Sequence, residues 1–449
     1  MAVLRRDLLA AAPVMVGGSA TLALGLAACG ASRPEQSANA PSSSAAPVTF
    51  QYWDWAATWK DLVQQLVTAH QASHPNVTIQ WDIAQDYWTK LQVAIAGGTA
   101  PDSWRMNGPN LPQWVSQGQL QDLSAYFAKD KDAAASLKAM ARVIVDYTKR
   151  DGKQWTMPFG QAISGVIAYN LDVMTAEGLT PPADVWTAGK WTWAQLAEHA
   201  GKLTRRDGSR DGYLVDHSGE TGWFPFLLAD GGALFDKDGK RSAIKSPQTR
   251  ETFDFFVELG VKQQVSPTPD QLKQQDATSR FLNGTLAMVP QGSWQIADLN
   301  LRAKSFRWDL VPVPLAPATR KAGSTNQMSS IAMDKGSTHK DAVWDWARLI
   351  GTKEGQDIIA QNEFFPARND SAEEIYYLAS KGPAHRPLLR DVLQVTQAYP
   401  WLDVAGNSSG WGPIVNPLVD QIFNGQIATT DGIQQMDDQL KAAIDRGFK

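Results

Sequence analysis

Two tryptophans around a carboxylate are the residues of this chain best suited to bind a small polar ring. Trp53, Asp54 and Trp55 follow one another in the sequence. An indole offers a flat apolar face and one N–H, whereas a carboxylate accepts hydrogen bonds. A sugar has apolar C–H faces and hydroxyl edges, so this triplet could stack on a sugar ring and accept bonds from its hydroxyls. The alternative for each tryptophan is burial in a hydrophobic core.

The chain contains 18 tryptophans, and several others lie beside glycine or small residues. Glycine neighbours leave an aromatic face uncovered, so we expect these tryptophans to be presented at the surface and to contact a ligand. They are Trp223 in Gly-Trp-Phe, Trp294 in Gly-Ser-Trp and Trp411 in Gly-Trp-Gly.

The Trp-Asp-Trp triplet lies between a predicted strand and a predicted helix. Residues 48–53 alternate in the manner of a strand, apolar residues recur at helical spacing over 59–70, and 77–81 alternate again. A strand, a helix and a strand within this length form a βαβ unit with parallel strands. Because ligands of open α/β sheets bind outside the carboxyl ends of the strands, the triplet is well placed for binding. We expect an α/β fold with high helix content.

Motifs that would indicate an enzyme are weak. Residues 406–410 match G-x-S-x-G, but Gly412 and Pro413 follow where the nucleophile elbow requires a helix. His70 and His74 have metal-ligand spacing without the glutamate of H-E-x-x-H, and Pro75 is adjacent. We therefore expect a binding protein without a cofactor or a metal. An exported glycan-active hydrolase stays open, since two carboxylates suffice for it.

The first 47 residues predict export and a membrane anchor. Arg5 and Arg6 precede an uncharged apolar run over 8–28, and Cys29, the only cysteine, follows small residues. This layout resembles a lipoprotein precursor with a signal peptide over 1–28 and a lipid on Cys29. Residues 29–47, rich in Ala, Ser and Pro, predict a flexible tether. A membrane-spanning helix is the alternative for 8–28, and Arg5-Arg6 leaves twin-arginine export open.

The length of the chain indicates how many lobes it forms, and its charge bears on whether it binds nucleic acid. Removing residues 1–28 leaves 421, enough for two lobes rather than one core. The chain has 42 basic and 46 acidic residues without a basic stripe, which argues against nucleic acid. With one cysteine, no disulfide can form within the chain.

An ordered set of motifs resembles the extracellular solute-binding proteins of ABC importers, in the oligosaccharide-binding family 1. Residues 90–102 resemble the family's helix that ends in a glycine-rich turn before Pro-Asp, and 118–123 match G-x-L-x-D-L. Residues 281–294 are similar to its F-x-x-G-x-x-A-M…G-x-W segment. Further matching segments are residues 157–159, 169–172, 353–356 and 365–368. The resemblance covers essentially all of the mature chain.

The resemblance implies two α/β lobes with a ligand cleft between them. The N-terminal lobe would comprise residues 48–160 plus 330–365, and the C-terminal lobe 161–329 plus 366–449. The counterpart of Trp294 commonly stacks on a sugar ring in that family. The candidate polar contacts are Asp54, Asn107, Gln161 and Arg368.

We therefore expect a lipid-anchored, monomeric substrate-binding protein of an ABC importer at the extracytoplasmic face of the membrane or in the periplasm. It would capture a neutral sugar or oligosaccharide by cleft closure and deliver it to the permease. The uncharged stretch 161–165 favours a neutral ligand over an anionic one. The same fold binding a polyol, a glycerophosphodiester or a peptide is the alternative.

Overall fold

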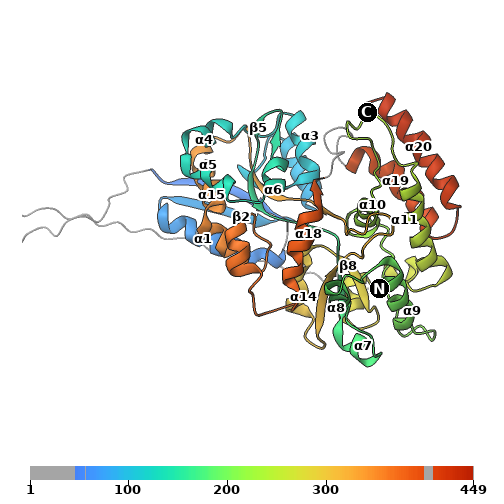
Figure 1. Ribbon diagram of the computed structural model, residues 1–449. Helices are drawn as coiled ribbons and strands as arrows, with labels where there is room; N and C mark the ends of the chain where they lie inside the picture. The colour runs from blue at the N-terminus through green and yellow to red at the C-terminus, as the bar shows by residue number, and fades with distance from the viewer. Residues whose placement is uncertain (1–45, 56, 399–407, 448–449) are drawn as a thin grey trace, which may run out of the picture. The chain divides into compact units, whose positions relative to one another are not determined.

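Two β-sheets, of five and three strands, organise the part of the chain that the structure describes. This computed structural model describes residues 46–55, 57–398 and 408–447 (Figure 1). These residues belong to one compact unit, Ala45–Lys449. Cys29, the predicted signal segment and residues 29–45 of the predicted tether lie outside the described residues.

The five-stranded sheet has the order β2-β1-β3-β11-β6. Its strands are β1 (Val48–Asp54), β2 (Val77–Ile83), β3 (Ser103–Asn107), β6 (Met157–Gly160) and β11 (Ser329–Met333). Strand β1 pairs in parallel with β2 and β3, whereas β11 runs antiparallel to β3 and β6. The predicted βαβ unit is confirmed, so the carboxyl ends of β1, β2 and β3 meet at one edge.

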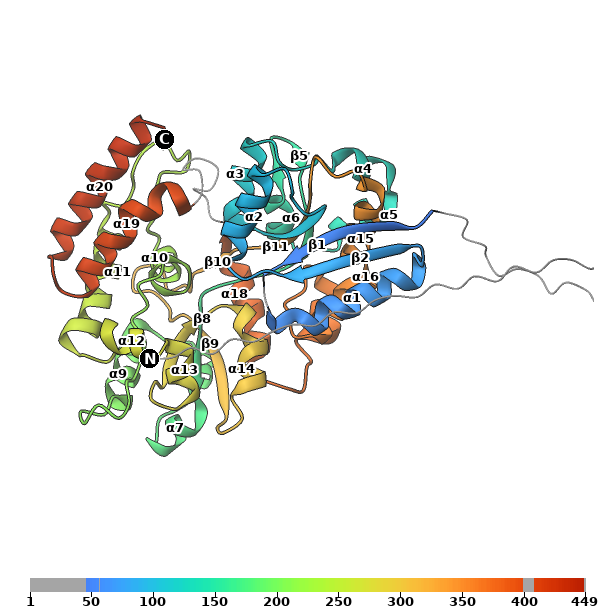
Figure 2. The ribbon, with the colours of Figure 1, turned by 180° about the vertical axis from the view of Figure 1, so that it is seen from behind.

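Three helices pack on one face of this sheet: α1 (Lys60–Ser73), α15 (Lys340–Gly351) and α16 (Lys353–Gln361) (Figure 2). Helix α1 buries Leu62, Val63 and Leu66 on its inner face, as its apolar spacing predicts. We call this sheet with its packed helices the first lobe.

The three-stranded sheet is antiparallel, with the order β8-β7-β9, and its strands are β8 (Met288–Gln291), β7 (Val166–Asn170) and β9 (Trp308–Pro312). Both of its faces are buried. Ile167 and Tyr169 of β7 enter one hydrophobic cluster, whereas Val166 and Ala168 enter another. The first of these clusters also holds side chains from α10 (Phe224–Ala229), α11 (Pro247–Val257), α19 (Ser408–Phe423) and α20 (Thr429–Asp445). We call this sheet with its packed helices the second lobe.

The chain passes between the two sheets three times. The first crossing is 160–165, the second 324–329, which includes β10 (Ser324–Asn326), and the third 363–366. Adjacent residues of the third crossing belong to different cores, since Phe364 packs in the first lobe and Phe365 in the second. The lobe boundaries that the sequence suggested remain a prediction.

Close backbone contact holds the crossings together. Gln161 N–H donates to Phe365 O at 2.8 Å, and Ser164 N–H donates to Thr325 O at 2.9 Å. A Cβ on Gly160 would lie 2.6 Å from Phe365 O, and one on Gly165, whose φ is +79°, would lie 2.3 Å from the carbonyl oxygen of residue 323. Only glycine permits this approach at either position.

The remaining elements complete the two lobes. The other strands are β4 (Lys149–Arg150), β5 (Lys153–Gln154) and β12 (Thr396–Ala398). The other α-helices are α2 (Tyr87–Ala96), α3 (Leu111–Ser116), α4 (Ser124–Lys129), α5 (Lys131–Lys138), α6 (Arg142–Tyr147), α7 (Leu171–Ala176), α8 (Pro182–Thr187), α9 (Trp193–Leu203), α12 (Pro269–Gln274), α13 (Ala277–Leu282), α14 (Ile296–Arg302), α17 (Asn369–Ser371) and α18 (Leu389–Val395). Short 3₁₀ or π turns are η1 (Ala57–Trp59), η2 (Gly108–Asn110), η3 (Gly219–Trp223), η4 (Glu258–Lys262), η5 (Ser293–Gln295), η6 (Ala372–Tyr376) and η7 (Arg386–Leu388).

Helix α19 corrects one argument from the sequence. We took Pro413 as evidence against a helix after residue 410, but α19 runs from Ser408 to Phe423 with Pro413 and Pro417 inside it. A proline removes one backbone donor and bends a helix, yet tertiary packing can carry the helix through. Within the described residues, no helix combines the length and the apolar character needed to cross a membrane.

Candidate functional site

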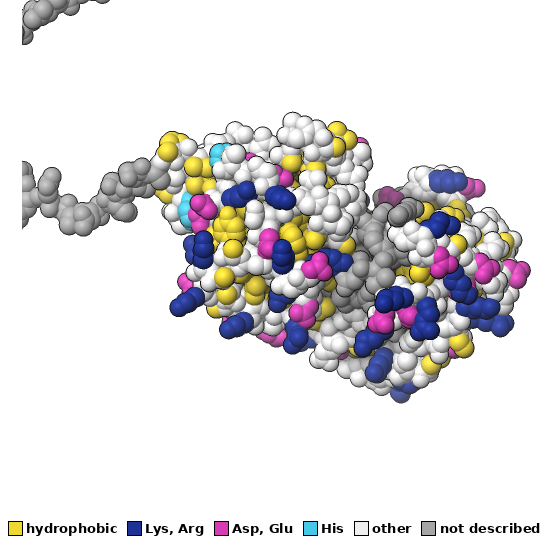
Figure 3. All heavy atoms as spheres, turned by 90° about the horizontal axis from the view of Figure 1, so that it is seen from above, with side chains coloured by type: hydrophobic (Ala, Val, Ile, Leu, Met, Phe, Trp, Pro, Cys, Tyr) yellow, Lys and Arg dark blue, Asp and Glu magenta, His cyan; other side chains and the backbone are white. Residues whose placement is uncertain are grey.

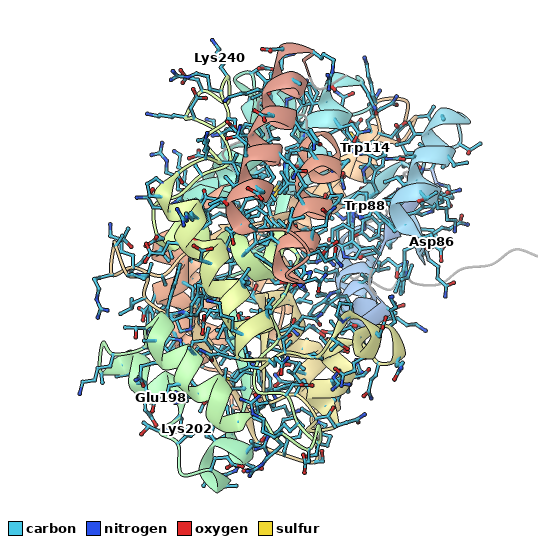
Figure 4. All side chains as sticks on the ribbon, turned by 90° about the vertical axis from the view of Figure 1, so that its right-hand side faces the viewer. Asp86, Trp88, Trp114, Glu198, Lys202 and Lys240 are labelled. Carbon is cyan, nitrogen blue, oxygen red and sulfur yellow. The ribbon has the colours of Figure 1, made fainter. Side chains whose placement is uncertain are left out.

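Aromatic side chains gather at the carboxyl edge of the five-stranded sheet. Trp55 follows β1, and Tyr87 and Trp88 begin α2 directly after β2. The Trp55 ring centroid lies 5.5 Å from those of both Tyr87 and Trp88. Tyr87 is buried, whereas Trp55 and Trp88 are half-buried, so each offers an open surface. Trp88 lies near Asp86 at the start of α2 (Figure 4).

Asp54 lies beneath this aromatic cluster and not on its surface. Its side chain is fully buried, and its carboxylate accepts from Tyr52 Oη at 3.0 Å and pairs with Arg105 Nη1 at 3.3 Å. The Trp55 backbone N–H donates to the same carboxylate at 2.7 Å. The prediction that Asp54 contacts a ligand is therefore corrected. Its carboxylate pairs instead with the buried Arg105, a contact that no local sequence pattern predicts.

Trp53 is less available than Trp55. It is half-buried, and Lys90 Nζ lies 4.9 Å from the centroid of its ring. A cation over an indole face is itself attracted to the ring. Any ligand that stacked on this face would displace Lys90, so we rank Trp53 below Trp55.

Trp294 lies on the second lobe but packs against the core of the first. It belongs to η5, which follows β8, and it is half-buried against the hydrophobic cluster of the five-stranded sheet. Ser293 anchors this turn to the first crossing: its N–H donates to Ile163 O at 2.8 Å, and its Oγ accepts from Ile163 N–H at 3.2 Å. A Cβ on Gly292 would lie 2.1 Å from the Trp294 ring, so glycine is required there. Trp294 thus lies where the two lobes meet.

Gln327 and Glu220 join this region, and the sequence analysis missed both. Gln327, in the second crossing, accepts the Gly108 N–H on its backbone oxygen at 2.7 Å and donates its own N–H to Ala162 O at 2.8 Å. Its side chain hydrogen-bonds Glu220 of η3. One half-buried glutamine therefore links the edge of β3, the first crossing and a carboxyl group of the second lobe.

Glu220 is held in an environment that disfavours its charge. Burial, and secondly the nearby Asp216 carboxylate, raise its pKa to about 7, although the bond from Gln327 acts in the opposite direction. Asp216 also accepts from Ser218 N–H and Oγ, both at 2.8 Å, which orders the turn that carries Glu220. The sequence signal for Glu220 was its place two residues before Gly222 and three before Trp223.

The two predicted amide side chains, Asn107 and Gln161, lie at the end of β3 and in the first crossing, respectively. Asn107 ends β3 and is half-buried; its Oδ1 accepts from Asn110 Nδ2 at 2.8 Å and caps η2. Gln161 is 1% exposed, and its Nε2 donates to Pro366 O at 3.1 Å. Its Oε1 is buried without a hydrogen-bond partner among the described residues. Asn107 borders the candidate site, whereas Gln161 supports the crossings from within.

The structure corrects three further predictions. Trp223 and Trp411 are 0% and 4% exposed and belong to the core of the second lobe, so neither presents a face at the surface. The small residues around them allow close packing instead of exposure; a Cβ on Gly222 would lie 2.0 Å from the Asp216 backbone oxygen. Arg368 makes a two-pronged ion pair with Asp370, at 2.9 and 2.7 Å, and is mostly buried.

A separate cavity of about 770 Å³ lies within the second lobe, lined by residues 214–217, 260–277 and the end of α19. Its charged groups already have partners: His217 Nδ1 lies 2.7 Å from Asp420, and Asp276 accepts from Ser279. It contains none of the predicted site residues. We assign no ligand to it.

Charge and metal chemistry do not define the site. Over the face shown in Figure 3, basic and acidic side chains are interspersed and form no stripe of one sign. Among the described residues, no group of three or more His, Cys, Asp or Glu side chains could hold a metal ion. His70 and His74 stack with ring centroids 4.5 Å apart inside the first lobe.

Comparisons with known proteins agree with this architecture. Residues 65–384 match the family described as bacterial extracellular solute-binding protein. A maltotriose-binding protein from Pyrococcus abyssi is 24% identical over 296 residues, which cover 64% of this chain and 59% of that protein, less than two thirds of its length. An uncharacterized lipoprotein in the oleD 5′ region of Streptomyces antibioticus is 24% identical over 338 residues, covering 70% of this chain and 68% of that protein.

Among solved structures, an ABC substrate-binding protein from Listeria monocytogenes in complex with cycloalternan superposes with a TM-score of 0.77. The two share 24% identity, and the match covers 89% of this chain and 99% of that one. This similarity shows the fold, and the family match extends over most of both lobes. The chain therefore belongs to the family of bacterial extracellular solute-binding proteins.

Proposed function

We propose that this protein is the lipid-anchored substrate-binding component of an ABC importer, and that it captures a neutral sugar or oligosaccharide between its lobes. The observation that carries the proposal is that half-buried tryptophans lie on both lobes. Trp55 and Trp88 belong to the first lobe, and Trp294 belongs to the second. Tryptophans contributed by both lobes suit a sugar ring, which has two apolar faces.

The polar groups beside these faces suit hydroxyls. Asn107 and Gln327 offer amide donors and acceptors, and Glu220, with its raised pKa, can donate as well as accept near neutral pH. A few placed polar groups among apolar walls are typical of small-molecule sites. The maltotriose-binding relative and the cycloalternan complex support a carbohydrate ligand.

An anionic ligand such as a glycerophosphodiester is less well served. Such a ligand requires free cationic donors. Arg105 is buried with Asp54, Arg368 pairs with Asp370, and Lys90 beside Trp53 pairs with Asp82 at 3.3 Å. No observation favours a hydrolase, so we propose binding without turnover.

Ligand capture would work through the three crossings. A sugar that contacts both lobes binds the closed arrangement more tightly than the open one, and only this difference drives closure. Hinge closure around a ligand is an established motion of such proteins. The closed form would then be the one delivered to the permease.

Thermal unfolding of residues 46–449 with a panel of oligosaccharides, polyols, glycerophosphodiesters and peptides tests the function. We expect only sugars to raise the melting temperature, because a ligand at 100 times its Kd adds about 2.7 kcal/mol to the free energy of unfolding. The sugar should be recovered intact by chromatography. A shift with phosphodiesters or peptides alone would contradict the carbohydrate assignment, and a consumed sugar would contradict binding without turnover.

Replacing Trp294 with alanine should lower sugar affinity at least tenfold, equivalent to about 1.4 kcal/mol, because one stacking face is lost. Isothermal titration calorimetry measures this change, and circular dichroism checks the fold. Trp186→Ala is the matched control: Trp186 is also half-buried, but it lies on α8 and donates to Asp391. Equal affinities for the Trp294→Ala and wild-type proteins would remove Trp294 from the site.

Glu220 should make stability depend on pH. The folded protein keeps its proton up to a pH near 7, whereas the unfolded chain loses it near 4.5, so the free energy of unfolding falls as the pH rises between these values. Glu220→Gln should remove this decline, which we expect to be about 1–3 kcal/mol, in urea unfolding at pH 5 and pH 8.

Glu198→Gln is the control for this measurement. Glu198 lies on α9 and pairs with Lys202 at 2.7 Å, which lowers the pKa of Glu198 (Figure 4). Glu198 is therefore mainly ionised from pH 5 to pH 8 in both the folded and the unfolded chain. It adds little to the pH dependence of the free energy of unfolding. If the wild-type and Glu220→Gln proteins keep the same dependence on pH, the burial of a neutral Glu220 is wrong.

Cys29 should carry the lipid. Cells that express the full chain should incorporate labelled palmitate into the protein, and Cys29→Ser should incorporate none, because a hydroxyl does not replace the thiol in forming the thioether. Cys29 is the only cysteine, so the loss can be assigned to this position. Label that persists in Cys29→Ser, or a wild-type mass that retains residues 1–28, would contradict the anchor.

A further inference from the structure

The guanidinium of Arg105 lies buried where all three crossings meet. Arg105 is on β3 and is 0% exposed. Its Nε donates to Ser329 Oγ at 2.6 Å, at the start of β11 and the end of the second crossing. Its Cζ lies 4.0 Å from the ring centroid of Phe159, which precedes the first crossing, and 4.6 Å from that of Phe364 in the third.

The same guanidinium also contacts the aromatic edge of the candidate site. Its Nη1 lies 3.3 Å from Asp54 Oδ2, and its Cζ lies 4.9 Å from the ring centroid of Trp55. Trp55 is half-buried and has an open surface. One side chain therefore touches Trp55, where we place the ligand, and the first-lobe end of each segment that connects the lobes.

Packing alone does not account for an arginine at this position. Burying an ion pair carries a desolvation penalty, and well-packed apolar residues in its place are often as stable or more so. Arg105 Nη2 is buried without a hydrogen-bond partner among the described residues, so even the polar contacts are incomplete. What a guanidinium adds is a rigid plane that can stack on several rings while it donates along its edge.

We propose that Arg105 is a positioning residue that couples ligand stacking on Trp55 to the equilibrium between the open and closed arrangements of the lobes. Phe159, Ser329 and Phe364 all belong to the first lobe, each at the point where a crossing leaves it, and all three contact one guanidinium. Rotation of the second lobe must bend the chain directly beyond these points, and Trp55 contacts the same guanidinium. This inference rests on the proposed function of ligand capture between the lobes.

The test compares Arg105→Lys with the wild type and with Arg280→Lys. Lysine keeps the charge beside Asp54 but loses the planar stacking and the bond to Ser329. Arg280→Lys is the matched control, because Arg280 is a buried arginine that pairs with Asp211 at 2.7 Å within the second lobe. The measurements are sugar affinity by calorimetry and radius of gyration by small-angle X-ray scattering, with and without sugar.

We expect Arg105→Lys to bind sugar at least fivefold more weakly and to show a different radius of gyration without ligand, while Arg280→Lys matches the wild type in both. A change in melting temperature alone would indicate a structural role and would overturn the proposal. So would wild-type affinity together with wild-type scattering in Arg105→Lys.

A second variant covers the case in which Arg105→Lys does not fold. Asp54→Asn with Arg105→Met removes both charges and fills the space with apolar atoms, and it should fold with the same weakened binding and altered scattering. Unchanged binding and scattering in this double variant would overturn the proposal. If the wild type binds no solute, the proposed function fails, and the scattering of the ligand-free proteins still decides the role of Arg105.

Discussion

A buried ion pair between Arg105 and Asp54 lies at the junction on which both lobes depend. Asp54 ends β1 and Arg105 lies on the neighbouring β3, so the pair spans the carboxyl edge of the five-stranded sheet. Neither charge reaches water, and each would be strongly destabilising without the other. The aromatic rings of Trp55, Phe159 and Phe364 enclose the guanidinium. The edge that presents ligand-binding groups and the segments that join the lobes are thus built around one charge.

The crossings are stiff where they touch and are tied to both sheets. Glycines at 160 and 165 let the strands approach within backbone contact. The buried hydroxyls of Ser164 and Thr325 hydrogen-bond each other there, and the Ser324 hydroxyl donates to the Ser164 backbone oxygen. Gln327 extends this network to Gly108 in the first lobe and to Glu220 in the second. Relative motion of the lobes must therefore repack a small number of identifiable contacts, which suits two discrete arrangements better than continuous flexing.

Both lobes contribute side chains to the candidate site. Half-buried tryptophans come from the first lobe (Trp55 and Trp88) and from the second (Trp294). The amide of Gln327 in the second crossing hydrogen-bonds Glu220, whose pKa is raised to about 7. The arginines nearest to this region are neutralised by aspartates. A ligand that fits such a surface is uncharged, has apolar faces and carries hydroxyls at its edges.

Local patterns in the sequence were sufficient for the elements and for part of the site. The alternation over 48–53 and 77–81 and the helical spacing between them identified β1, α1 and β2, and with them the carboxyl edge at which Trp55 lies. These features are encoded by neighbours in the chain, since periodicity records which side of an element faces the core.

Which candidate side chains stay open was decided only by tertiary structure. Asp54 is buried because Arg105, 51 residues away, brings a charge to it. Trp223 and Trp411 lie in the core of the second lobe, the opposite of the exposure that we expected from the glycines beside them. At Trp223, the neighbouring Gly222 permits a close approach to the Asp216 backbone. Glu220 became a candidate only through Gln327, which lies more than 100 residues further along the chain. The sequence by itself determined the family, the strands and the aromatic chemistry. The tertiary structure decided which of those residues stay accessible, because burial and pairing depend on contacts between distant segments.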